Sequence, residues 1–204
     1  SGEAVAFIYP FEPPDGLAFT VDADSVALSW SRPDTVAVEN PILLYRIYRT
    51  TVGQAFPDTA LAEVADGAPV VQFLDEAVPF ADLEYAVTAL YQNTESDTSG
   101  HVVVPEAAWT TAPTNLMTSV AVDSIQLQFE RPVPVHSGNP IVAYRVYRAP
   151  AEEPFPVDPL AEFSDPSDMP SYLDLGVPVG SYHYAVSAVY ASGESGLSND
   201  SPAI

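Results

Sequence analysis

The chain has 204 residues and carries 28 acidic side chains against six basic ones, which gives a formal net charge of -22. This charge repels the phosphates of nucleic acids and anionic lipids, so we expect no nucleic-acid partner. No run of residues reaches the roughly 18 to 20 apolar positions that a membrane helix needs, and we expect no membrane insertion. The lack of cysteine and lysine excludes disulfides, thiolate nucleophiles, zinc-thiolate sites and lysine Schiff bases.

The acidic residues are scattered along the chain rather than gathered in one motif. Some are close in sequence, but none belongs to a calcium loop of the D-x-[DN]-x-[DN]-G type: Asp22 and Asp24, Glu95 and Asp97, Asp165 and Asp168. We interpret the acidity as a solvated surface that keeps the protein soluble, with calcium binding as the alternative and no other cofactor. The first residues lack the basic region and apolar core of a signal peptide, so we expect a mature or excised chain.

The N-terminal segment, residues 1–12, is apolar and rich in residues that favour strands. It reads EAVAFIYPFE from Glu3 to Glu12. This composition predicts a strand made of Val5, Ala6, Phe7, Ile8 and Tyr9.

From residue 13 onward the chain contains two copies of one unit. A constant offset aligns Pro14–Thr98 with Pro113–Leu197, and roughly 33 of about 85 aligned positions are identical. The repeat predicts a first domain at residues 13–105 and a second at residues 106–204. Even the arginines obey the offset, since Arg32, Arg46 and Arg49 align with Arg131, Arg145 and Arg148.

Within each copy, apolar residues alternate with small or polar ones, a period that is typical of strands with one buried face. The first copy has this period in DSVALSWSRP (Asp24–Pro33), NPILLYRIYRT (Asn40–Thr50) and LEYAVTALY (Leu83–Tyr91), and the second copy has a counterpart of each. Prolines fall largely between these runs and indicate loops. About seven short strands in roughly 90 to 100 residues predict an all-β fold of two tandem immunoglobulin-like sandwiches.

This succession of motifs resembles fibronectin type III domains, particularly those of bacterial secreted proteins. The resemblance covers nearly the whole chain and rests on Trp30, N-P-I-x-x-Y-R-I-Y-R, L-D-x-x-V-P and Y-x-V-x-A-x-Y. It implies a tyrosine corner at Tyr182, a buried tyrosine whose hydroxyl bonds back to the preceding loop. Leu83 takes that position in the first domain, where we expect a weaker corner. The aromatic residues expected in the two cores are Trp30, Tyr45, Tyr85, Phe129, Tyr144, Tyr182 and Tyr184.

We find no catalytic signature in the sequence. His101, His136 and His183 share no repeat position and accompany no nucleophile motif, so we expect them to be exposed strand or loop residues. Tyr48 and Tyr147 alternate out of phase with the core residues. We expect them to pack against neighbouring arginines by cation–π contacts, with surface contact to a carbohydrate as the alternative.

Three connections complete the prediction. The loops QNTESD (Gln92–Asp97) and ASGESG (Ala191–Gly196) are predicted to be connecting turns. In the linker PEAAWTTAP (Pro105–Pro113) we expect Trp109 to pack at the junction of the domains and to limit bending.

The two ends of the chain differ in a way that suggests self-assembly. The first domain ends in HVVV, whereas the matching positions of the second read DSPA, which predicts a short, polar last strand interrupted by Pro202. A spare strand at Val5–Tyr9 and a deficient one at the other end favour strand addition from one subunit to the second domain of the next. The alternative is that the N-terminal segment simply begins the first strand of its own domain.

The sequence therefore predicts a non-catalytic structural or adhesive protein, extracellular or on the cell surface. The preferred version is a subunit or segment of a cell-surface fibre that assembles head-to-tail with itself, or that joins neighbouring domains of a longer chain. The alternative is a spacer or carbohydrate-binding module from a secreted polysaccharide-degrading enzyme, with a glycan as partner.

Overall fold

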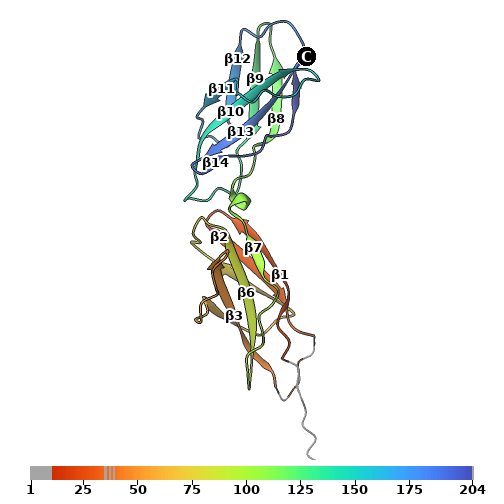
Figure 1. Cartoon of the computed structure of the whole chain (residues 1–204). Coiled ribbons are helices and arrows are strands. Elements are labelled where there is room, and N and C mark those ends of the chain that lie inside the picture. The colour runs from red at the N-terminus through yellow and green to blue at the C-terminus, as the bar shows by residue number, and fades with distance from the viewer. Residues whose placement is uncertain (1–10, 35, 37, 39, 204) are drawn as a thin grey trace, which may run out of the picture. The chain divides into compact units, whose positions relative to one another are not determined.

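The computed structural model describes residues 11–34, 36, 38 and 40–203 (Figure 1). The predicted strand Val5–Tyr9 lies outside these residues. The chain divides into two compact units between Glu106 and Ala107, next to the boundary between residues 105 and 106 that the repeat predicts. No helix in the described part of the chain is long and apolar enough to cross a membrane.

Unit 1 consists of two antiparallel sheets. The first has the strand order β1-β2-β5 and contains β1 (Asp15–Asp22), β2 (Ser25–Ser31) and β5 (Val70–Asp75). The second has the order β4-β3-β6-β7 and contains β3 (Ile42–Thr51), β4 (Ala62–Ala65), β6 (Leu83–Tyr91) and β7 (Val102–Val104). The predicted all-β sandwich is confirmed for this unit.

Unit 2 repeats this arrangement after a short 3-10 helix, η1 (Glu106–Trp109). One sheet has the order β12-β9-β8, with β8 (Thr114–Val120), β9 (Ser124–Glu130) and β12 (Ser171–Leu175). The other sheet contains, in spatial order, β11 (Ala161–Phe163), β10 (Ile141–Pro150) and β13 (Tyr182–Tyr190). Strand β13 also pairs with β14 (Gly193–Glu194) and with β15 (Ser201–Ala203). The duplicated sandwich follows from the duplicated hydrophobic pattern.

The core of each unit forms where the inward residues of its two sheets meet. In unit 1, Trp30 and Tyr45 are buried, and their rings meet edge to face with centroids 5.6 Å apart. In unit 2, Phe129 and Tyr144 take these positions with centroids 5.0 Å apart. The smaller Phe129 is accompanied by a larger Phe163, whose counterpart in unit 1 is Val64. This exchange conserves core volume, which is the kind of substitution that cores tolerate best.

The last strand of unit 2 is short, as predicted, with 3 residues, but Pro202 does not interrupt it, and that part of the sequence-based prediction is wrong. β15 pairs with β13 through Tyr182↔Ala203, His183↔Pro202 and Tyr184↔Ser201, the same register that β7 has on β6. The carbonyl oxygen of Pro202 accepts a hydrogen bond from Thr118 Oγ1 on β8 at 2.6 Å, so this residue presents its backbone polar side away from β13. Its missing N–H therefore costs no ladder bond.

The outer side of β15 is also occupied. Asn199, just before the strand, accepts from Leu116 N at 2.9 Å and donates to Leu116 O at 3.1 Å through its side-chain amide. Together with the bond from Thr118, these contacts tie β15 to β8. The edge at which we expected strand addition is therefore closed by the unit's own side chains.

The predicted tyrosine corner at Tyr182 does not form as expected. Tyr182 lies at the margin of the core, with the guanidinium carbon of Arg148 5.2 Å from its ring centroid, and its hydroxyl makes no hydrogen bond to a described residue. The hydroxyl that bonds back to an earlier strand belongs to Tyr184, and Tyr85 does the same in unit 1. Because both units have this bond, the substitution at Leu83 does not deprive unit 1 of it.

Candidate functional sites

A polar network covers the outer face of the sheet β4-β3-β6-β7. Arg46 donates from Nε to Glu63 Oε1 at 2.9 Å and from Nη1 to Glu95 Oε2 at 2.6 Å. Glu95 also accepts from the hydroxyls of Tyr48 at 3.0 Å and Thr88 at 2.5 Å. Strand alternation turns Arg46, Tyr48 and Thr88 outward on β3 and β6, and the turn after β6 returns Glu95 onto them.

Unit 2 reproduces this network nearly atom for atom. Arg145 donates from Nε to Glu162 at 2.8 Å and from Nη1 to Glu194 at 2.5 Å. Glu194 accepts from the hydroxyls of Tyr147 at 2.6 Å and Ser187 at 2.5 Å. The only change in residue type is serine for threonine, which keeps the hydroxyl donor. A network needed by both units points to a role in the fold.

The donors around Glu95 decide its protonation. Burial raises the pKa of this carboxyl, but the hydrogen bonds from Thr88, Tyr48 and Arg46 outweigh burial and lower the pKa below its usual value. The pKa of Glu194 is lowered by the equivalent donors. A carboxylate with so many donors stays ionised and is a weak proton acceptor, which does not suit a general base. Its evident effect is to fasten the turn after β6 to the sheet.

The two outer-face tyrosines do not form a matched pair of surface rings. Tyr147 is only 6% exposed, which leaves little of its ring for the carbohydrate contact named as the alternative. Its ring is covered because it lies against the sheet while its hydroxyl donates to glutamate. Tyr48 is half-buried and borders a shallow hollow of about 420 Å³, together with Arg46, Asp58 and Glu63. In the described residues these hydrogen bonds take the place of the predicted cation–π contacts.

A second duplicated cluster lies at the edge of each core. The buried carboxylate of Asp75 accepts from the Tyr85 hydroxyl at 2.7 Å and from Arg49 Nη1 at 2.8 Å. Burial and then the bond to Asp75 raise the pKa of Tyr85, so this hydroxyl remains a donor. The cluster recurs in unit 2 with Asp174, Tyr184 at 2.8 Å and Arg148 at 2.7 Å. A buried charge that is paired and hydrogen-bonded in this way is a structural element.

Each unit contains a histidine–carboxylate pair, and the two residue types occupy opposite positions of the repeat in the two units. His101 Nδ1 lies 2.8 Å from Glu84 Oε1, joining the last strand region of unit 1 to β6. His183 Nδ1 lies 2.7 Å from Asp200 Oδ2, joining β13 to the segment before β15. By the offset, His101 aligns with Asp200 and Glu84 aligns with His183. Each unit thus holds its last strand by a histidine–carboxylate pair of opposite orientation.

We expect the stability of unit 2 to fall as the pH rises above the ordinary histidine pKa of about 6.5 and His183 loses its proton. Burial lowers the pKa of His183, but the hydrogen bonds to Asp200 and the Glu153 carbonyl, the latter at 2.9 Å, outweigh it and raise the pKa. A raised folded pKa means that the stabilisation is complete below the unfolded pKa and is lost as pH rises through the folded one. An exposed pair of this kind contributes about 0.5–1 kcal/mol.

Urea unfolding of unit 2 across a pH series on both sides of that ordinary value, followed by hydrogen exchange of its peptides, measures the difference in stability between low and high pH. His183→Gln keeps a polar side chain but cannot gain a proton, so the variant should show a smaller difference. A difference as large as in the unaltered protein would mean that another group is responsible.

Two further histidine contacts test the expectation of a non-catalytic protein. His101 Nε2 is 3.5 Å from the Thr98 hydroxyl, which gives the order hydroxyl, imidazole and carboxylate of a catalytic triad. The hydroxyl distance is long, the His101 side chain is 43% exposed, and Leu197 replaces Thr98 in unit 2. We therefore assign the arrangement to the fold.

His136 corrects the expectation that all three histidines are exposed, because it is only 3% exposed. Its ring meets Trp109 edge to face with centroids 5.2 Å apart, and its Nδ1 accepts from Gly138 N at 3.0 Å. Trp109 belongs to unit 2 and is fully buried there. The linker residue that we expected at the junction therefore contributes to the packing of one unit.

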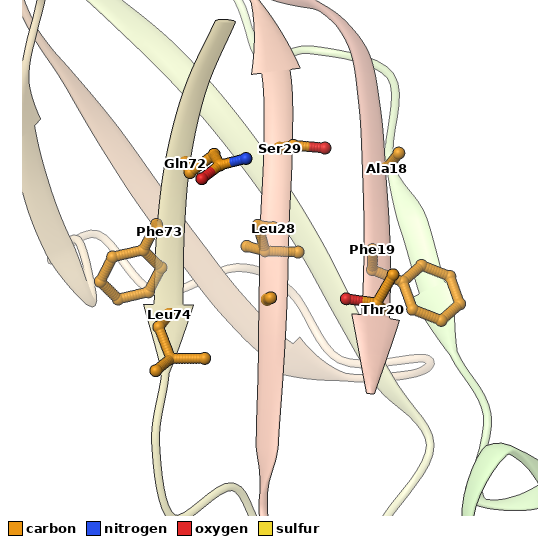
Figure 2. Close-up of a pocket in the computed structure, with 9 residues that line it drawn as sticks. Ala18, Phe19, Thr20, Leu28, Ser29, Gln72, Phe73 and Leu74 are labelled. Carbon is orange, nitrogen blue, oxygen red and sulfur yellow. The ribbon is translucent and has the colours of Figure 1, made fainter. Parts of the chain in front are cut away.

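A hollow of about 490 Å³ lies on the outer face of the sheet β1-β2-β5 (Figure 2). Ala18, Ser29 and Gln72 lie side by side across its three strands, and its lining has no charged side chain. In unit 2 the longer Met117 and Gln128 replace Ala18 and Ser29. The hollow lacks the convergent polar groups that fix a small ligand, so it indicates no particular chemistry.

No group of three or more histidine or acidic side chains in the described part of the chain is placed to hold a metal ion. Two of the neighbouring acids seen in the sequence have other partners. Glu95 belongs to the network on the sheet, and Asp165 accepts from the backbone N–H groups of Ser167 and Ser171 at 3.0 and 3.1 Å.

Sequence analysis missed the carboxylates at the centre of both clusters, although a signal for them was present. Glu95 and Asp75 are identical to their counterparts Glu194 and Asp174, and so are their arginine partners. Identity between repeats at polar positions marks side chains that the fold uses twice. Asp75 and Asp174 belong to the L-D-x-x-V-P motif, and Glu95 and Glu194 lie in the two predicted turns, so the repeat marks all four positions.

No family model matches the sequence, and no curated protein is significantly similar to it. Solved structures with a similar fold include titin kinase and its flanking domains, with 23% identity and a TM-score of 0.40 over 47% of this chain and 17% of that one. The chicken CNTN1 FN1-FN3 domains have 18% identity and a TM-score of 0.39 over 93% and 65% of the two chains. An Fn3-like protein from Clostridium thermocellum has 21% identity and a TM-score of 0.37 over 46% and 91%.

This chain therefore spans less than two thirds of the first two of these structures. Its fold class follows from its own strands, whose order and register are the same in both units. The chain is built of two tandem antiparallel β-sandwiches of the immunoglobulin-like architecture that the sequence predicts.

Proposed function

We propose that the protein is a non-catalytic structural or adhesive component, extracellular or on the cell surface, whose copies associate head-to-tail through Val5–Tyr9. The observation that carries this proposal is the run Ala4–Phe11, which has no charged residue in a chain with 28 acidic side chains. Copies with a net charge of -22 repel one another, so their contacts must form at uncharged surfaces. The resemblance to domains of secreted proteins supports the location.

The duplicated clusters support a scaffold. The carboxylates of Glu95 and Asp75 and their counterparts are supplied with donors from within their own units, and their positions are the same in both. Groups held in this way stabilise the sandwich in both units, and their hydrogen bonds leave them poorly available for catalysis at the sheet faces.

Head-to-tail contact between different surfaces of identical copies extends into a fibre unless rotation closes a ring. Because β15 is tied to β8, the incoming segment needs a receiving surface other than the outer side of β15. The proposal therefore retains the N-terminal segment and gives up the strand-addition edge that the sequence suggested.

We expect deletion of Ser1–Pro10 to abolish concentration-dependent association while leaving both units folded, because it removes most of the uncharged run and none of the described strands. Sedimentation velocity across a concentration series, with electron microscopy of the most concentrated samples, measures the effect. Thermal unfolding is the control for the fold. Particles of unchanged length after deletion, or monomers in both forms, contradict the proposal.

A further inference from the structure

One end of unit 2 exposes three valine side chains around one hollow. Val120 at the end of β8 is 54% exposed, Val122 in the following turn 103%, and Val179 in the loop before β13 106%. We call these three residues the apolar end of unit 2. Single exposed aliphatic residues are common, but a group of this size at one place marks an interaction surface.

The backbone holds these residues together as one surface. Ala121 N donates to Ser124 O at 2.8 Å, and Val177 N donates to Asp123 O at 3.0 Å, which joins the turn after β8 to the loop after β12. The two segments border a hollow of about 170 Å³ whose lining includes Ala203 of β15. Among the described residues that line it, Asp123 is the one ionisable side chain. The surface is therefore preformed and nearly uncharged.

Unit 1 does not repeat this surface. The counterparts of the three residues are Val21, Ala23 and Phe80. Val21 and Phe80 are half-buried, and Ala23 is small. An apolar group that breaks an otherwise close repeat points to a contact made by unit 2 alone.

The chain itself supplies a segment that matches this surface. Ala4–Phe11 is uncharged and is bounded by Glu3 and Glu12. In an extended segment, Val5, Phe7 and Tyr9 would lie on one face, since side chains alternate along a strand. Apolar side chains on one partner and exposed aliphatic side chains on the other bury surface without opposing charge, which few other parts of a chain with net charge -22 allow.

We propose that the apolar end of unit 2 is the receiving surface for Val5–Tyr9 of a second copy of this chain. The inference rests on the proposed function and names the surface that the function leaves open. The N-terminal segment belongs to unit 1 and the receiving surface belongs to unit 2. When two copies make one contact, one copy still has a free segment and the other still has a free receiving surface. Association is stronger at high salt, which screens the repulsion between the acidic copies.

The substitution Val179→Asp tests the surface, because it adds a charge to a fully exposed loop residue without touching the core. We expect it to weaken association about tenfold or more, and Val122→Asp with Val179→Asp to weaken it further. The matched control is Val157→Asp, a loop valine of the same unit that is 95% exposed and lies outside the apolar end. Sedimentation velocity in 0.5 M salt, on the order of a 4 Å Debye length, compares the variants.

The outcomes separate the two proposals. If the protein lacking Ser1–Pro10 still associates, the proposed function fails. If that deletion abolishes association but Val179→Asp associates as strongly as Val157→Asp, the segment docks elsewhere and the present inference alone is overturned. A synthetic peptide of residues 1–12 titrated into the deleted protein gives a second measurement. Amide shifts at residues 120–123 and 177–180 support the inference, and shifts confined to the hollow of Figure 2 contradict it.

Discussion

Asp75→Ala is expected to lower the free energy of unfolding of unit 1 by about 3–5 kcal/mol, the range for breaking a buried ion pair by removing one partner. The change deletes a carboxylate whose side chain is 6% exposed and leaves the Arg49 guanidinium and the Tyr85 hydroxyl without their acceptor. Because Arg49 is 25% exposed and can reach water, the result should fall near the lower end. Urea unfolding followed by hydrogen exchange of unit 1 peptides measures the change.

Two comparison variants sharpen this result. Tyr85→Phe removes one hydrogen bond and keeps the ion pair, so it should cost only about 1 kcal/mol. Asp174→Ala makes the same change in unit 2 and should destabilise that unit while leaving unit 1 as it was. Equal small losses for Asp75→Ala and Tyr85→Phe would mean that the buried pair does not support the fold.

Trp109→Ala is expected to destabilise unit 2 by about 3–5 kcal/mol, the usual cost of truncating a buried tryptophan. The ring is fully buried and packs on His136, which lies before the first residues of β10. Its position in η1, at the start of unit 2, would otherwise favour a minor effect, since segments between domains usually tolerate change. Hydrogen exchange of unit 2 peptides in urea measures the loss.

The chain contains two tryptophans, so this variant provides its own control. After the substitution Trp30 alone reports fluorescence, and it lies in the core of unit 1. The unfolding midpoint seen by Trp30 should not move. A shift of that midpoint, or an unchanged unit 2, would contradict the assignment of Trp109 to the packing of unit 2.

Alternation and repetition were sufficient to predict the fold. Val26, Leu28 and Trp30 are all buried on one face of β2, and Tyr45 and Ile47 are buried on β3, as the period of two requires. The offset transferred each of these assignments to unit 2, where Phe129 and Tyr144 are likewise buried. Burial of one sheet face is a property of a short sequence window, which explains why it can be recognised without a structure.

What escaped prediction depends on residues that are distant in sequence. Alternation turns Arg46 outward, but it cannot say that Glu63 and Glu95, from different segments, converge on it. His136 looked exposed because its counterpart Ala37 gave no hint that Trp109 would cover it. These contacts depend on tertiary packing, for which the local pattern holds no information.

The error at β15 has a different cause. The residues of the strand are polar and include Pro202, but pairing with β13 uses backbone groups of the neighbouring positions. A proline whose backbone polar side faces away from the partner strand does not interrupt the ladder. Position within the register, rather than residue type alone, decides whether a strand tolerates proline.

Hydrogen exchange of the full chain at low and high protein concentration tests the central claim most directly, because it locates the contact between copies without altering a residue. We predict that raising the concentration slows exchange in two places, residues 4–11 and the apolar end of unit 2 at residues 120–123 and 177–180, and leaves the outer side of β15 unchanged. Protection that does not depend on concentration, or that appears only at other surfaces, would contradict the account.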